Sequence, residues 1–65
     1  MNATQHGIKI GNAIFAHCKA EGITPKWTGL MEADVDFLPA EIVADDAAMA
    51  EVERAAKESF LRAAK

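Results

Sequence analysis

The chain has 65 residues and a formal charge of −3, and 51% of its residues are hydrophobic, although 14 of these are alanines. A chain this short has room for one domain and buries only about 60% of the surface that its unfolded form exposes, which excludes a large core. The acidic balance disfavours a protein that reads nucleic acid through its phosphates. The single cysteine, Cys18, excludes an internal disulfide and favours the cytoplasm.

The first predicted element is a helix from about residue 7 to residue 21, preceded by polar residues 1–5 that we expect to fray. Gly22 suits the position that ends this helix, whereas Gly7 and Gly11 weaken its start by ~1 kcal/mol each. The face expected to meet the core carries residues spaced by three and four: Ile10, Ala13, Ile14, His17 and Cys18.

The middle segment, about residues 25–37, is predicted to be either a second helix or irregular. Thr24 and Pro25 form a helix-start signal, because the threonine can cap the helix and the proline lacks only an N–H that needs no partner. Gly29 and the strand-like alternation of residues 34–37 argue against a regular helix. Residues 33–38 are expected to be the least regular part.

A long helix is predicted to end near residue 64 and to begin either at residue 39 or, after a break, near residue 46. Pro39 can occupy a first helical turn, and Asp45 or Asp46 can cap a separate helix, so we favour a break there. Residues 47–65 are rich in strong helix formers. One strip of this helix suits close contact with another helix: Ala48, Ala55, Leu61 and Ala64.

These elements predict an all-α fold, a small bundle of two or three helices. Below about 70–80 residues, a single core rarely stabilises a chain by more than ~3–5 kcal/mol. We therefore expect the bundle to bury surface against a partner, and homodimerisation is one way to complete it.

Charge is distributed unevenly along the chain. Residues 1–31 carry +2, residues 32–53 carry −8 with no base, and residues 54–65 carry +3. The simplest interpretation is a solvated face whose charges match the helix dipoles. Two others are docking of an electropositive protein, which includes mimicry of nucleic-acid phosphates, and pairing of the acidic segment with the basic end of a second copy.

No motif carries catalytic chemistry, so we expect no enzyme, no cofactor and no metal. Asp34 and Asp36 begin the spacing of a calcium loop, but Leu38 and Pro39 occupy the next required positions. His6, His17 and Cys18 are the candidate zinc ligands, but a helix points the adjacent His17 and Cys18 apart and no second ligand pair exists, which disfavours a zinc site. No apolar run is long enough to span a membrane.

A helix–turn–helix regulator is an alternative, because residues 22–24 fit the turn between two helices. Its recognition helix would carry only Lys26 as a base. The sequence instead favours a non-catalytic protein-interaction module, a small acidic adaptor or inhibitor of a size and charge common among phage and mobile-element accessory proteins. Its partner is a protein, which can be a second copy. The candidate contact residues are Trp27, Glu32, Asp34, Asp36, Phe37, Glu41, Asp45, Asp46 and Phe60.

Overall fold

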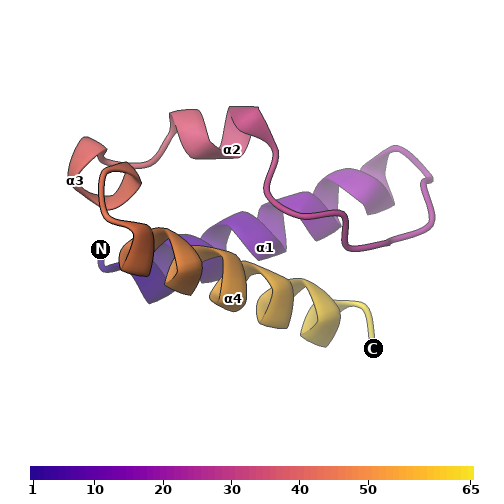
Figure 1. Cartoon of the computed structure of the whole chain (residues 1–65). Coiled ribbons are helices and arrows are strands. Elements are labelled where there is room, and N and C mark those ends of the chain that lie inside the picture. Colours follow the sequence, from indigo (N-terminus) through magenta and orange to yellow (C-terminus); the bar gives the residue numbers. More distant parts are fainter.

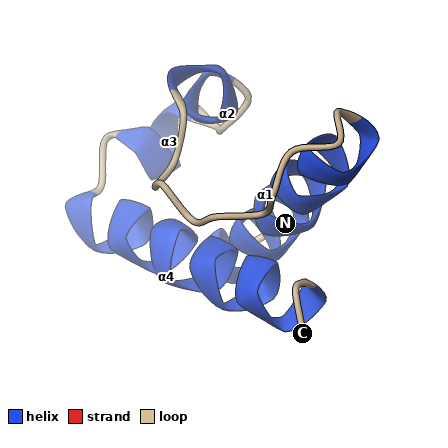
Figure 2. Ribbon diagram, turned by 90° about the vertical axis from the view of Figure 1, so that its right-hand side faces the viewer, coloured by secondary structure: helices blue, strands red, loops and turns tan.

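A computed structural model describes all 65 residues and has four helices and no strands, which confirms the predicted all-α fold. The two long helices are α1 (Ala3–Ala20) and α4 (Asp46–Ala63). The two short ones are α2 (Glu32–Asp36) and α3 (Ala40–Val43). Figures 1 and 2 show α1 and α4 side by side, with the segment that contains α2 and α3 passing back over them.

The long helices run in the same direction. The start of α1 meets the start of α4, where the Thr4 hydroxyl donates a hydrogen bond to Glu51. Further along, Phe15 packs edge-on against Phe60, with ring centroids 6.0 Å apart. Because parallel helices cannot be joined by a short turn, residues 21–45 must run back along the pair, as Figure 1 shows. We call residues 21–45 the return segment.

Glycines bring α1 and α4 into close contact. A Cβ atom added at Gly7 would lie 2.5 Å from the Val52 carbonyl oxygen and 2.6 Å from the Ala55 Cβ. One added at Gly11 would overlap the carbonyl oxygen of Ala56. Both glycines are buried, so α1 meets its partner helix with a face centred on them.

The glycine contact corrects the predicted core face of the first helix. That face is rotated toward Gly7 and Gly11, which leaves Ala13 and His17 exposed. Of the strip predicted to suit contact with another helix, Ala55 is buried against α1, whereas Leu61 and Ala64 remain exposed.

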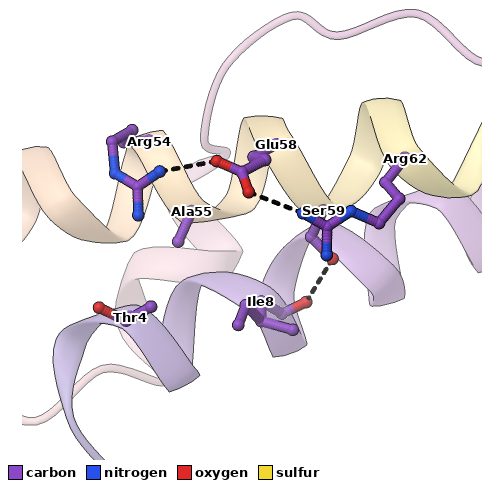
Figure 3. A pocket seen from close by; sticks show the side chains of 7 residues that line it. All are labelled: Thr4, Ile8, Arg54, Ala55, Glu58, Ser59 and Arg62. Carbon is purple, nitrogen blue, oxygen red and sulfur yellow. Dashed lines mark hydrogen bonds and ion pairs between the residues drawn. The ribbon is translucent and has the colours of Figure 1, made fainter.

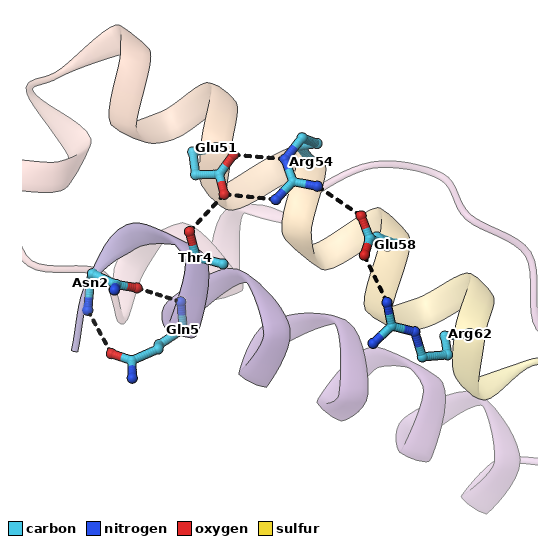
Figure 4. Close-up of polar contacts among 7 residues, drawn as sticks. All are labelled: Asn2, Thr4, Gln5, Glu51, Arg54, Glu58 and Arg62. Atoms are coloured by element: carbon cyan, nitrogen blue, oxygen red, sulfur yellow. Dashed lines mark hydrogen bonds and ion pairs between the residues drawn. The ribbon is translucent and has the colours of Figure 1, made fainter.

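The first helix begins at Ala3, within the polar residues 1–5 that precede the predicted start. Asn2 caps α1: its side-chain oxygen accepts from the Gln5 N–H at 2.8 Å, and the Gln5 side chain accepts from the Asn2 N–H at 2.9 Å. Figure 4 shows this reciprocal pair beside Thr4. This reciprocal arrangement, a capping box, satisfies two N–H groups that the start of a helix otherwise leaves free. The helix therefore begins four residues before the start predicted near residue 7.

The middle segment reverses the predicted order of regular and irregular parts. Residues 23–31 contain no helix, and Gly29 has φ +99°, which a helix does not allow. The helix lies where irregularity was expected, because the Asp34 carboxylate accepts from the Met31 N–H at 3.1 Å and fixes the first turn of α2. The recognition helix that a helix–turn–helix protein would need after residue 24 is therefore not formed.

The last helix is interrupted where the aspartates predicted a break. Asp45 precedes α4, and its carboxylate accepts from the N–H groups of Ala47 and Ala48 at 3.0 and 3.3 Å. Pro39 directly precedes the short α3, which is packed against α4.

The core is small and lies in two parts. At one end, Leu38 and Ile42 from the return segment pack on Val52 of α4. At the other end, Phe60 is 1% exposed and is covered by Phe15 and by Trp27, whose ring centroid lies 5.6 Å away. The return segment thus contributes side chains to both parts of the core.

Candidate functional site

Phe37 is the most exposed large hydrophobic side chain of the protein, with 88% of its surface accessible to solvent. It follows α2 directly, and its N–H is bonded to carbonyl groups of that helix's last turn. Its neighbour Leu38 points inward and is 9% exposed. Burial of Leu38 therefore anchors the chain at the point where Phe37 projects outward.

A groove lies beside the Phe37 ring, between α1 and α2. Its volume is about 400 Å³, and it is more apolar than polar. We call it the Phe37 groove, and its lining residues are His6, Lys9, Ile10, Ala13, Asp34, Phe37 and Leu38. Because α1 uses its glycine face to meet α4, Ile10 and Ala13 are left on the side that forms a wall of this groove.

The two walls of the Phe37 groove carry opposite charge. The α1 wall has Lys9 and His6, while the α2 wall has Asp34. Neither Lys9 nor Asp34 makes an ion pair, since the three ion pairs of the protein all lie within α4. The groove therefore offers an apolar floor between a basic and an acidic edge.

The acidic middle segment does not form a single acidic cluster with one role. Asp34 and Asp45 cap α2 and α4, and Glu51 is paired with Arg54. The other acids are exposed and make no hydrogen bond or ion pair within the chain: Glu32, Asp36, Glu41, Asp46 and Glu53. Of the nine candidate contact residues, only Asp34 and Phe37 line the groove.

The two remaining aromatic candidates belong to the interior. Phe60 is a core residue, and Trp27 is half-buried against it. Packing of Trp27 on Phe60 therefore holds the return segment against the helix pair.

A row of ion pairs, which we call the polar ladder, runs along the edge of the helix pair opposite the Phe37 groove. Glu51 pairs with Arg54 at 2.7 Å, Arg54 with Glu58 at 2.7 Å, and Glu58 with Arg62 at 2.8 Å, as Figure 4 shows. The Thr4 hydroxyl extends the ladder onto α1 with a 2.6 Å bond to Glu51. Hydrogen bonds from Arg54 and Thr4 lower the pKa of Glu51 to about 2, and Glu51 in turn raises the pKa of Arg54.

The ladder borders a second, smaller pocket of about 60 Å³. Figure 3 shows Arg54 and Arg62 both bound to Glu58 at its edge, and Ser59 directed at the Ile8 carbonyl. The Ser59 hydroxyl also lies 2.6 Å from the Asn12 side-chain oxygen. Because the glutamates neutralise both arginines, this pocket holds no free positive charge for an anionic ligand.

No three His, Cys, Asp or Glu side chains gather closely enough to hold a metal ion. None of the helices combines the length and the apolar character needed to cross a membrane. Comparisons with protein-family models, with curated proteins and with solved structures found no match.

Sequence reasoning identified Phe37 and Asp34 but missed the α1 wall of the groove. Ile10 and Ala13 are both predicted on the core face. Ile10 does pack beside the core cluster and also lines the groove, whereas Ala13 is exposed. The available signal was the four-residue spacing of Gly7 and Gly11, which places both on one face and allows another backbone to approach there. Rotating the helix toward that face leaves Ile10 at its edge.

Proposed function

We propose that the chain is a non-catalytic protein-binding module that engages its partner through Phe37 and the Phe37 groove. The observation that carries the proposal is the 88% exposure of Phe37 on the rim of an apolar groove. Leaving a phenyl ring in water forgoes roughly 1.5–3 kcal/mol of burial free energy, and a partner that covers the ring recovers it. Aromatic anchors next to pockets are typical of binding hot spots.

The surroundings of Phe37 favour a specific contact over a non-specific one. Met31, at the N-terminal end of α2, is 62% exposed, so the helix presents apolar side chains at both ends. Between them, Glu32 and Asp36 are exposed and free of ion pairs. The Phe37 groove itself is mostly apolar between Lys9 and Asp34, and an apolar centre with a polar rim is the usual composition of a protein interface.

The proposal is tested by capture of proteins from a lysate with three immobilised chains: the unchanged chain, Phe37→Ser and Leu61→Ser. Leu61 is the matched control, because it is an apolar side chain of α4, 45% exposed, that does not line the groove. We expect a protein recovered by the unchanged chain and by Leu61→Ser to be lost with Phe37→Ser. Captured proteins that do not depend on Phe37, or that depend equally on Leu61, would contradict the proposal.

A further inference from the structure

The Phe37 groove contains both halves of a complementary contact. It presents an aromatic side chain on its rim and, beside that ring, a space of about 400 Å³. A benzene ring fits in a cavity of roughly 150 Å³, so the groove has room for one phenyl side chain from another molecule. From this arrangement we propose that the occupant of the groove is Phe37 of a second copy of the chain, so that the protein is a two-fold homodimer. This inference rests on the proposed function and names the partner.

Two-fold symmetry requires an interface that is complementary to itself, so that each protomer presents the same patch. The Phe37 groove meets this requirement, because one patch supplies both the ring and the site that receives it. A single two-fold contact would insert both rings at once. An isolated ring with no adjacent groove, or a groove with no exposed ring, would instead need an unrelated partner.

The charges of the groove select one orientation of the second copy. A two-fold axis that runs along the groove places the α1 wall of each protomer over the α2 wall of the other. Lys9 of one chain then faces Asp34 of its partner, twice in the dimer, and neither group makes an ion pair within its own chain. An axis across the groove would bring like walls together, with Lys9 against Lys9, which electrostatic repulsion disfavours.

The surface of the monomer is consistent with an uncovered contact. The protein exposes 4500 Å², whereas a compact monomer of 7.0 kDa exposes about 4000 Å². Its core contains only six buried hydrophobic residues: Leu38, Ile42, Val52, Ala55, Ala56 and Phe60. Chains of this size commonly gain stability by association, and α2, which adds little to that core, is free to take part.

The pairing of Lys9 with Asp34 provides a test that distinguishes a specific dimer from a non-specific aggregate. Sedimentation equilibrium of the unchanged chain should show a concentration-dependent increase from the mass of one chain to that of two. Lys9→Glu alone and Asp34→Lys alone should each be monomeric, because each places like charges across the interface. An equimolar mixture of the two should form a dimer again, since opposite charges then face each other at both contacts.

Two further variants test the role of the ring. Phe37→Ser should weaken the dimer roughly a hundredfold or more, because two buried rings are lost, and Leu61→Ser should leave it unchanged. Asp34 also caps α2, so circular dichroism must show that Asp34→Lys keeps its helix content. If it does not, salt dependence takes its place: we expect high salt to weaken the dimer of the unchanged chain and, by screening the repulsion, to increase the association of Lys9→Glu.

A chain that stays monomeric at all concentrations, or a dimer that Phe37→Ser leaves intact, would overturn the inference. The same experiments distinguish failure of the dimer from failure of the proposed binding function. A monomeric chain that captures another protein in a Phe37-dependent manner keeps the binding function and assigns the groove to that protein. A chain that neither self-associates nor captures any protein through Phe37 contradicts both.

Discussion

Glu51 is the acidic side chain whose pKa the fold lowers. It accepts hydrogen bonds from Arg54 within α4 and from Thr4 of α1, so its charged form is bound by both long helices. The pKa of this carboxyl falls from the ordinary value of 4.5 for a glutamate to about 2 in the folded chain. The contact thus connects the protonation of one surface residue to the pairing of α1 with α4.

The sign of the resulting pH dependence follows from the lowered pKa. The folded state binds the Glu51 proton less readily than the unfolded state, so the contribution of Glu51 to stability is fully present above pH 4.5 and is lost as the pH falls toward about 2. We expect Glu51→Gln to reduce the loss of stability over this range. Urea unfolding at a series of pH values measures it, with Glu53→Gln as the control, because Glu53 is exposed and unpaired. Equal pH profiles for the two variants would contradict the prediction.

The pairing of α1 with α4 depends on the absence of two side chains. In an isolated helix, replacing Gly11 with alanine would add about 1 kcal/mol of stability, because alanine has the higher helix propensity. In the folded protein, the added methyl group would overlap the Ala56 carbonyl, which belongs to the α4 backbone and cannot rotate away.

We therefore expect Gly11→Ala to lower the free energy of unfolding by about 1–3 kcal/mol, although alanine has a higher helix propensity than glycine. Urea unfolding followed by circular dichroism measures the change. Ala16→Gly, on the exposed face of α1, is the reference and should cost about 1 kcal/mol from propensity alone. A Gly11→Ala variant more stable than the unchanged chain would mean that the two backbones are not in close contact.

The helices that the sequence predicted correctly are those with strong local signals. The composition of residues 47–65 and the capping aspartate at position 45 determine α4 largely without help from the rest of the chain. The start of α1 was missed because Asn2 and Gln5 act only as a pair. The α2 segment was misjudged because its first turn depends on one bond, from the Met31 N–H to the Asp34 carboxylate, and because Leu38, just after it, is held by packing on Val52 of α4.

The candidate site was predictable only in part, for the same reason. An exposed phenylalanine cannot be distinguished from a buried one by its own sequence context, and Phe37 and Phe60 were treated alike. Their difference in exposure arises from the pairing of the long helices. This pairing buries Phe60 between Phe15 and Trp27 and leaves Phe37 outside the core. The groove itself exists only once the return segment crosses α1.

At the scale of the whole molecule, the return segment and the helix pair share one core. Trp27 lies on Phe60, and Phe60 also contacts Phe15, so these three aromatic side chains connect α1, α4 and the return segment. The segment therefore cannot detach without exposing the most deeply buried ring of the protein.

This sharing predicts a single cooperative unfolding transition. The fluorescence of Trp27, the only tryptophan, reports on the return segment, and far-ultraviolet circular dichroism reports mainly on α1 and α4. We expect the two signals to change with the same urea midpoint, as in a two-state protein. An earlier midpoint for the fluorescence would show that the return segment opens while the helix pair stays folded.

The parallel course of α1 and α4 also determines how the molecule would respond to tension. Figure 1 shows the two chain ends at opposite ends of a body whose longest dimension is 34 Å. A force that pulls the ends apart acts along the helix axes and slides α1 against α4. The contacts at Gly7 and Gly11 would then resist together, whereas an antiparallel hairpin pulled from adjacent ends opens one turn at a time. A force along the long axis therefore loads these contacts in shear.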